Sequence, residues 1–388
     1  MSPVDPSISV DALIALCQDL VRVPSLSGGE AAVAERVQAA MRANGCDDVV
    51  VDPWGNVIGR WQGQEEGPPL LFDAHMDTVP VADPDRWQHD PYGGAVVDGR
   101  LYGRGAADMK GALAAMIHAM GRLVAAGRRP RRDVYVSATV AEELFEGVAL
   151  VPVLERVRPG LVVIGEASEL NLKIGQRGRA EIVVTTAGKS CHSSSPEKGE
   201  NAIYKMAEAI GKLRAMPPPV HPELGPGISE VTDIISSPYP GASVVPDRCR
   251  VTIDRRLLLD ETPESVLAAY EAVLGDAAAV AIAESSLTCY TGETLGGRRF
   301  FPAWMFDRDH PVIHDALAAL AAAGLRPEIT TYRFCTNGSA SAGRFGILTV
   351  GFGPGAEHLA HIDDEYIPVA DLAAAAAGYR EMAAVLAP

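Results

Sequence analysis

The sequence predicts an α/β protein in which a mostly parallel sheet is covered by helices on both faces and is interrupted by an inserted α+β unit. Three observations lead to this fold class. Short apolar segments alternate with segments of helical periodicity up to about residue 176. The order then changes to β-α-β-β-α-β, which is typical of a split βαβ sandwich. The alternation of helix and strand resumes from Pro311.

Size and charge limit the classes of partner. The chain has 388 residues, which fits two domains of ordinary size with a full hydrophobic core. It carries 34 Lys and Arg against 50 Asp and Glu, and the net charge of −16 is spread without a basic block. Nucleic acids and anionic membrane surfaces would repel such a protein, so the composition argues against both as partners.

The first part of the chain begins with two amphipathic helices and continues with strands separated by helices. Gly127 follows the third helical pattern and is well placed as its C-terminal stop. The predicted helices cover residues 10–22, 29–44 and 110–126, and the predicted strands cover 49–51, 56–61, the apolar run ending at Phe72, 133–140 and 161–164.

The inserted unit, residues 177–293, separates residues 1–176 from residues 294–388. Its predicted strands cover residues 180–187, 229–235, 249–256 and 280–285, and its predicted helices cover 201–213 and 263–275. Residues 292–299 are expected to be the linker that returns to the first domain. A C-terminal helix rich in alanine is predicted over residues 369–384.

Residues 1–6 lack a basic segment followed by an apolar one, and no run of about 18 apolar residues occurs. We therefore expect a cytoplasmic protein with no membrane partner. The six cysteines are scattered without a Cys-x-x-Cys pair, which argues against a disulfide framework and against a zinc site built from thiolates.

The most informative local pattern is His75-Met76-Asp77, which follows an apolar run. Residues i and i+2 of an extended segment point to the same side, so this imidazole and this carboxylate can converge on a metal ion. Asp108 stands in a Gly-rich loop directly before a helix. It can be either a metal ligand or an N-cap of that helix.

Further potential ligands follow other predicted strands. Glu142 and Glu143 come directly after one apolar strand, Glu166 follows the next, and His358 and His361 follow a later one. Open α/β sheets bind their ligands at the carboxyl ends of the strands, so these side chains are expected to meet there. The series favours a metal site over unrelated solvated side chains.

The residue types indicate which metal chemistry the site can support. Oxygen and imidazole ligands without thiolate suit zinc, cobalt or manganese. A carboxylate-rich set with one histidine per metal fits two ions roughly 3.5 to 4 Å apart that share a water of lowered pKa. Such a site also needs a spare carboxylate to take up a proton and return it to the leaving amine, and Glu142 or Glu143 can do so.

These residues resemble the motifs of the di-zinc amidohydrolase family that contains aminoacylase, acetylornithine deacetylase, succinyl-diaminopimelate desuccinylase and glutamate carboxypeptidase. The resemblance covers nearly the whole chain, and the motifs occur in the family's order. They are His75-x-Asp77, Gly103-Arg104-Gly105-x-x-Asp108-Met109-Lys110-Gly111, Glu142-Glu143, Glu166 and Ala360-His361-x-x-Asp364-Glu365. The resemblance implies a zinc-peptidase-like catalytic domain with an inserted ferredoxin-like dimerisation, or lid, domain.

The resemblance also implies roles at a centre of two divalent metals, most simply zinc, with cobalt or manganese as alternatives. The implied ligands are His75 and Glu166 on one metal, Glu143 and His361 on the other, and Asp108 bridging both. Asp77 would orient His75, and Glu142 would be the general base. His361 is preferred to His358 because it stands in the family's Ala-His-x-x-x-Glu frame.

Three further residues take roles from the same resemblance. His192 would reach across a dimer and stabilise the oxyanion in the partner's site; alternatively, its segment only caps the helix that follows Asn201. Arg256 would hold a substrate carboxylate with its guanidinium fork. Asn337 would contact the substrate through its amide.

We therefore expect a homodimeric hydrolase, paired through the inserted domain, that cleaves the amide bond of an N-acyl amino acid or a short peptide. A dipeptidase or carboxypeptidase is the alternative among enzymes. Outside catalysis, the alternative is a silent protein that keeps its metals for binding or regulation. Loss of the base would mark such a protein, whereas Glu142 and Glu143 are both present.

Overall fold

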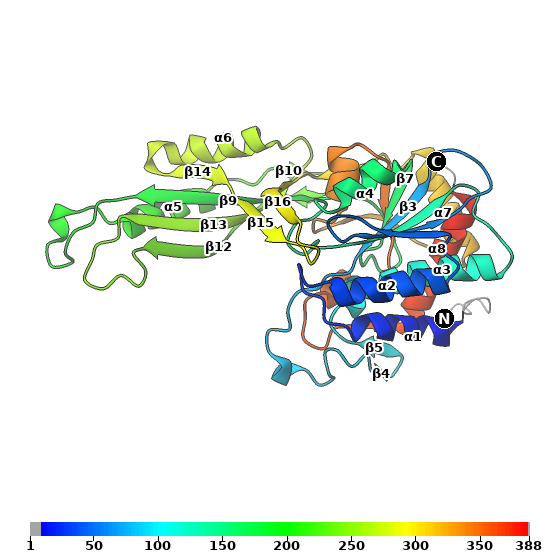
Figure 1. Ribbon diagram of the computed structural model, residues 1–388. Coiled ribbons are helices and arrows are strands. Elements are labelled where there is room, and N and C mark those ends of the chain that lie inside the picture. Colours follow the sequence, from blue (N-terminus) through cyan, green and yellow to red (C-terminus); the bar gives the residue numbers. More distant parts are fainter. Residues whose placement is uncertain (1–8, 387–388) are drawn as a thin grey trace.

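The computed structural model describes residues 9–386 and shows a large body from which a second unit projects (Figure 1). The predicted absence of a leader segment in residues 1–6 lies outside the described residues. Between residues 9 and 386, no helix has both the length and the apolar character required to cross a membrane.

The body is built on a nine-stranded sheet whose central strands are parallel. In the centre, β3 (Leu70–His75) lies between β6 (Val134–Thr139) and β7 (Leu161–Ile164), and β7 also pairs with β20 (Thr349–Gly351). The outer strands are β1 (Asp48–Val51), β2 (Val57–Trp61), β8 (Leu172–Gln176), β18 (Trp304–Met305) and β19 (Ile329–Tyr332). Because the central strands run in one direction, their carboxyl ends share one edge of the sheet.

Helices cover both faces of this sheet, as predicted. One core lies under α1 (Val10–Val21), α2 (Ala31–Ala43), α3 (Gly111–Ala125), α7 (Pro311–Ala322) and α8 (Val369–Val385). The other lies under α4 (Leu150–Val157) and the turn Ser339–Arg344. Side chains alternate between the two cores along each strand: Phe72 and Val163 belong to the first, and Leu71 and Val162 to the second.

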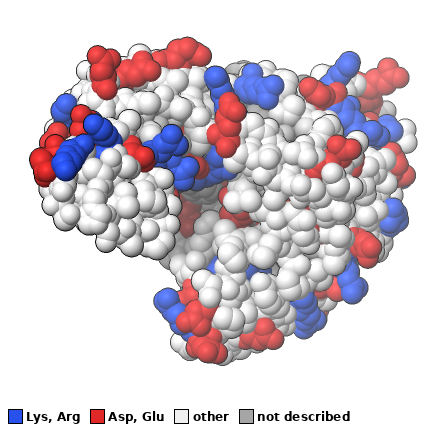
Figure 2. All heavy atoms as spheres, turned by 60° about the vertical axis from the view of Figure 1, so that its left-hand side comes forward, with Lys and Arg blue, Asp and Glu red and all other residues white. Residues whose placement is uncertain are grey.

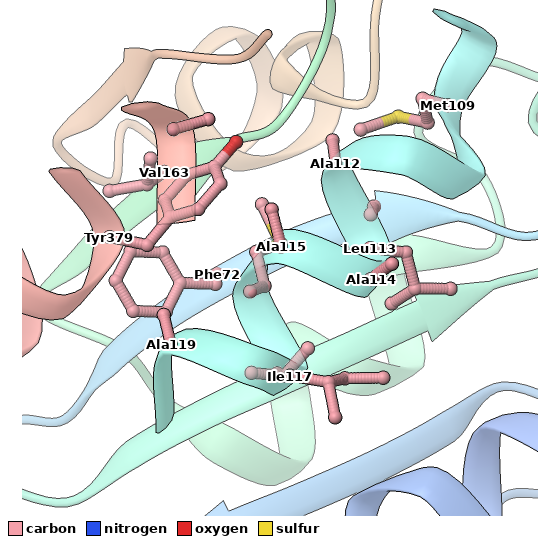
Figure 3. Packing of buried hydrophobic residues seen from close by; sticks show 14 of the residues in the cluster. Phe72, Met109, Ala112, Leu113, Ala114, Ala115, Ile117, Ala119, Val163 and Tyr379 are labelled. Carbon is pink, nitrogen blue, oxygen red and sulfur yellow. The ribbon is translucent and has the colours of Figure 1, made fainter. Parts of the chain in front are cut away.

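Helix α3 is buried along most of its length, because it lies between the sheet and α8. Its first ten residues are all buried, and half of them are glycine or alanine. Figure 3 shows its alanines beside Phe72 and Tyr379, whose ring centroids are 5.4 Å apart in an edge-on contact. Close packing of this helix fixes the Gly-rich turn before it, which carries Asp108.

The inserted unit has its own antiparallel sheet and its own core. The strand order is β12 (Ile228–Ser237), β13 (Arg248–Leu257), β9 (Gly178–Ala187) and β14 (Ala279–Ile282), with the short β17 (Phe300–Phe301) also paired to β9. Helices α5 (Ala202–Arg214) and α6 (Pro263–Leu274) pack on this sheet. The predicted β-α-β-β-α-β order is confirmed, and β12 forms an edge of the sheet.

Three small strand groups complete the fold. Strands β4 (Val96–Val97) and β5 (Arg100–Tyr102) pair with each other, and β5 also pairs with β21 (Tyr366–Pro368). Strands β10 (Val220–His221) and β11 (Gly225–Pro226) form a short hairpin after α5.

The third group shows that the prediction of a linker over residues 292–299 is wrong. Most of that segment is β16 (Thr294–Arg298), which pairs with β15 (Glu284–Thr288) as a hairpin. Cys289 and Leu295 are buried in the core of the body, so the hairpin is packed there. The sequence gives no strand signal for β16, because two of its five residues are glycines and only one is apolar. Helix α4 and strand β8 were also not predicted. The domain limits at residues 177 and 293 stay a prediction.

Candidate metal centre

Six predicted side chains meet at the carboxyl edge of the main sheet, where the central parallel strands end. Two come from the end of β3 and from the residues just after β7, and the other four come from the turn before α3 and from the loops after β6 and β20. They are His75, Asp108, Glu142, Glu143, Glu166 and His361.

Asp108 lies between the two imidazoles and offers one carboxylate oxygen to each. Its Oδ1 is 2.9 Å from His75 Nε2, and its Oδ2 is 3.0 Å from His361 Nε2. Glu166 Oε1 lies 3.6 Å from His75 Nε2, and Glu143 Oε2 lies 3.0 Å from His361 Nε2. The cluster therefore consists of two adjoining groups that share Asp108.

Burial dominates the electrostatics of this cluster. It raises the pKa of Glu142 well above its ordinary value, against the opposing effect of His75. Burial, together with the negative charge of Asp108, raises the pKa of Glu166 in the same way. Burial also favours the neutral form of Asp108, but hydrogen bonds with His361 and His75 outweigh it and lower the pKa of that carboxyl.

The donor set fits divalent metal ions. Four carboxylates and two imidazoles crowd together, and Glu142 Oε1 is buried without a hydrogen-bond partner. In each of two overlapping groups, His75 with Glu142 and Glu166, and His75 with Asp108 and Glu143, the ligand atoms lie within 4.8 Å of one another. So many buried carboxylates need cations to balance them, and oxygen and imidazole are suitable donors for such ions.

Asp77 supports the cluster differently from the prediction. Its main-chain oxygen lies 2.9 Å from His75 Nδ1, whereas its carboxylate Oδ1 lies 3.5 Å away. The carboxylate instead accepts hydrogen bonds from the backbone N–H groups of Glu142, at 3.0 Å, and Glu143, at 3.2 Å. Asp77 thus orients His75 through its carbonyl and holds the Glu142–Glu143 backbone through its side chain.

The inserted unit and the segment just after it contact the same loop from the other side. Arg299, in the segment that leads into β17, donates to the main-chain oxygen of Leu144. Arg179, on β9, donates to Glu146 Oε1 at 2.7 Å. The loop that carries Glu142 is therefore held between the body and the inserted unit.

Glu365 holds the backbone at Asp108 in place. Its Oε1 accepts hydrogen bonds from the backbone N–H groups of Ala107, at 2.9 Å, and Asp108, at 3.1 Å, and its Oε2 pairs with Arg104 at 2.6 Å. Both members of this ion pair are buried. The sequence placed Glu365 in a motif, but its contact with the backbone of Asp108 spans more than 250 residues and carries no local signal.

A cavity of about 420 Å³ opens over the cluster. Figure 2 shows it as a hollow beside the projecting unit, with acidic and basic atoms along its walls. Arg256 lines the cavity, as does Arg179, which sequence reasoning missed. Both arginines pair with Asp254, at 2.7 Å for Arg256 and 2.8 Å for Arg179. In the antiparallel pairing of β13 with β9, these two arginines stand opposite each other.

Apart from His75 and Asp77, which lie within and beneath the cluster, two predicted residues do not line this cavity. Asn337 is only 2% exposed; its Oδ1 accepts from Gly147 N at 2.6 Å, and its Nδ2 donates to Asp73 Oδ2 at 2.8 Å and Thr139 Oγ1 at 2.9 Å. Its amide is therefore committed within the protein, and the predicted substrate contact is wrong. His192 is exposed, in the loop beyond the end of β9 that ends at Ala187.

The fold and the cluster together define an α/β protein of the metallohydrolase class. The family described as Peptidase family M20/M25/M40 matches residues 71–384, so the chain belongs to that family. It is a metal-dependent hydrolase that acts on amide or peptide bonds.

Three individual proteins illustrate the similarity. An uncharacterized protein of Escherichia coli strain K12, YgeY, is 36% identical over 371 residues, which cover 93% of this chain and 91% of that protein. A succinyl-diaminopimelate desuccinylase of Rhodospirillum centenum is 32% identical over 279 residues, or 67% of this chain and 72% of that protein. The crystal structure of an M20 family metallo-carboxypeptidase from Sulfolobus solfataricus shares the fold, with a TM-score of 0.74, 17% identity and coverage of 96% of this chain and 98% of that chain.

Proposed function

We propose that the protein hydrolyses the amide bond of an N-acyl amino acid or a short peptide, with Glu142 as the general base. The observation that carries this proposal is the state of the Glu142 carboxylate. It is 5% exposed, its Oε1 has no hydrogen-bond partner, and its Oε2 lies 4.0 Å from His75 Nε2 inside the cavity. A base must keep one oxygen free for the proton that it takes up.

Five residues would hold the metals. His75 and Glu166 would bind one ion, Glu143 and His361 the other, and Asp108 both, which agrees with its two oxygens facing different imidazoles. When bound, two zinc ions, or else cobalt or manganese, supply Lewis acidity and a water of lowered pKa.

The chain's own residues then move the proton and hold the substrate. Glu142 accepts the proton of the attacking water and returns it to the leaving amine, and its raised pKa suits the second transfer. Asp77 keeps the Glu142 backbone in place during both transfers. Arg256 faces the cluster across the cavity and would hold a carboxylate of the substrate.

The oxyanion would be stabilised by His192 of a second copy. Strand β9 has ten residues and so spans about 33 Å. It begins beside the cavity, at the residue before Arg179, and His192 lies beyond its far end, so this histidine is too far away to serve the cavity of its own chain. The exposed edge strand β12 presents Ile234 and Ile235, which are 54% and 42% exposed, and these suit burial against a second inserted unit.

Two alternatives remain distinct from this proposal. A dipeptidase or carboxypeptidase would use the same centre on a peptide bond; the name of the Sulfolobus enzyme favours it, whereas the name of the Rhodospirillum enzyme favours a deacylase. A silent metal-retaining protein is disfavoured by the intact Glu142.

One hydrolysis screen tests the proposal. Metal-free protein is reloaded with zinc, cobalt or manganese, its metal content is measured, and amine release is followed on N-acetyl amino acids, N-succinyl amino acids and dipeptides. We expect release from at least one group with two metals bound per chain. Two bound metals with no hydrolysis of any group would overturn the proposal.

Mixing two inactive variants tests the shared site. His192→Ala and Glu142→Gln chains should each be inactive alone and should regain part of the activity when combined. In such a mixture, one site of each heterodimer receives an intact base and an intact partner histidine. Verified heterodimers without activity would contradict the role of His192.

A further inference from the structure

Arg177 is a buried cation that lacks an acidic partner. Four arginines are buried within residues 9–386: Arg104, Arg177, Arg255 and Arg299. The other three each form an ion pair with a glutamate. Arg177, at 8% exposed, instead donates from Nε to the main-chain oxygen of Arg333 and from Nη1 to that of Pro226, both at 3.0 Å.

Its surroundings make this charge costly. Burial lowers the pKa of Arg177, and the positive charges of Arg256 and Arg333 lower it further. Carbonyl dipoles satisfy two of its N–H groups but do not neutralise its charge. The negative charge of Glu357 opposes this lowering, but Glu357 is paired with Lys173, and no described carboxylate forms an ion pair with Arg177. A buried charge is ordinarily retained with a counterion.

The position of Arg177 indicates where such an anion would come from. Arg177 lines a second hollow of about 1020 Å³, together with Lys173, Tyr332 and Arg333. Glu357 lines both this hollow and the metal cavity, so the two spaces adjoin. An arm of a substrate whose amide lies at the metal cluster would pass Glu357 to reach Arg177.

Among the charged side chains that line the hollow, Arg177 is a buried cation without an ion-pair partner. Lys173 is already paired with Glu357 at 3.0 Å. Glu169, Glu223 and Glu328 are exposed side chains on the wall, and none of them forms an ion pair with Arg177. An incoming carboxylate would thus meet a fixed guanidinium that is held by two carbonyls and oriented before binding.

We propose that Arg177 binds a substrate carboxylate other than the one assigned to Arg256, so that the preferred substrates carry two carboxylates. This inference rests on the proposed function, because it assigns one arm of the same amide substrate. The recognised group is a carboxylate in either case. It can belong to the acyl half, as in a dicarboxylic acyl group, or to the amine half, as in an acidic amino acid.

Binding measurements on matched compounds test this proposal without requiring turnover. The host is zinc-loaded Glu142→Gln protein, and affinities are measured by calorimetry. N-succinyl-alanine is compared with N-butyryl-alanine, which replaces the second carboxylate by a methyl group, and N-acetyl-glutamate is compared with N-acetyl-glutamine. We expect the acidic member of at least one pair to bind roughly 10- to 100-fold more tightly. The pair that shows this preference tells which half carries the carboxylate.

Adding Arg177→Gln should reduce that preference to near unity and leave the affinity for the neutral member unchanged. Arg177→Lys keeps the charge and should retain part of the preference. This variant replaces Arg177→Gln in the test if the glutamine variant does not fold. Arg298→Gln is the matched control, because Arg298 is an exposed arginine outside the hollow. The proposal is overturned if neither acidic compound is preferred, or if the substitutions at Arg177 weaken both members of a pair equally. Either result can be obtained whether or not the wild-type protein hydrolyses these compounds, so failure here is distinct from failure of the proposed function.

Discussion

The inner and outer halves of the candidate metal centre differ in how the fold holds them. The inner half consists of His75, Glu142 and Glu166, all buried, whereas the outer half consists of Glu143 and His361, with Asp108 between the two. The side chain of His75 is 1% exposed and that of His361 is 50% exposed. The same types of ligand therefore stand in two different solvent environments within a few ångströms.

This difference follows from the elements that supply the ligands. His75 ends β3 in the middle of the sheet, and its second ring nitrogen is fixed by the carbonyl of Asp77. His361 lies in a loop and has a positive φ of 63°. Charges in a buried site interact more strongly than charges that water reaches. We therefore expect the inner half to hold its metal more tightly and the outer half to exchange its metal more readily.

The largest expected effect concerns the neighbours Glu142 and Glu143, whose substitutions should affect catalysis and metal binding differently. Glu142→Gln should lower the hydrolysis rate by about 10² to 10⁴-fold, since it removes the proton acceptor. Its metal content should stay at the wild-type level. Glu143→Gln, one residue away, should instead lose metal from the outer half. Rates and metal content of both variants are measured on the same preparations, and full activity of Glu142→Gln would contradict the assignment of the base.

The second prediction compares the two histidines. His75→Ala removes a ligand from the rigid half and should weaken metal binding by more than the 10- to 100-fold typical of a substitution at a supporting residue. His361→Ala should leave the inner ion bound and release the outer one. Metal content after dialysis against a weak chelator measures this difference. Equal loss of both ions from both variants would show that the halves do not bind independently.

The sequence predicts the inner half more directly than its supports. His75, Glu142 and Glu166 all follow apolar strands, and parallel strands end at one edge of a sheet, so their meeting could be inferred from local patterns. His361 was chosen from the motif of a resembling family rather than from periodicity. The contacts of Arg299 with Leu144 and of Glu365 with Asp108 join distant segments.

The wrong prediction for Asn337 has the same origin. An amide in a loop near a predicted site can face the substrate or the protein interior, and only the packing of that loop decides between them. Here the loop places Asn337 under the site, where Asp73, Thr139 and Gly147 use all of its amide groups. Sequence patterns therefore identified side chains that meet in the cluster, but they did not identify the buried residues that hold these side chains in position.

The third prediction concerns the contact of Arg299 with Leu144, which positions residues of both halves. Arg299 holds the main chain at Leu144, directly after Glu142 and Glu143. Arg299→Ala should lower kcat by about tenfold with little change in KM, because small displacements of a catalytic group are costly while the substrate contacts remain. Arg299→Lys should restore part of kcat, and the exposed neighbour Arg298→Gln should behave as wild type. A change in KM alone would place Arg299 in substrate binding instead.

The smallest effect concerns the proton that the outer half must release. In the metal-free protein, hydrogen bonds with Asp108 and Glu143 raise the pKa of His361 to about 10, so its imidazole is charged at pH 7. A metal ion binds only the neutral ring, so binding to the outer half displaces this proton. The affinity of the outer half should therefore rise with pH until about pH 10, where the free histidine has lost its proton.

The same shift affects the metal-free fold in the opposite direction. A histidine whose pKa is raised by folding stabilises the protein fully below its unfolded pKa of about 6.5, and this contribution is lost as the pH rises toward the folded value. Calorimetric metal titrations in two buffers of different ionisation heat count the protons released. His361→Gln should release about one proton fewer per chain than the wild type at pH 7. An unchanged proton count would mean that His361 is already neutral in the metal-free protein, and that the exposed half of the centre differs from the buried half in solvent access alone.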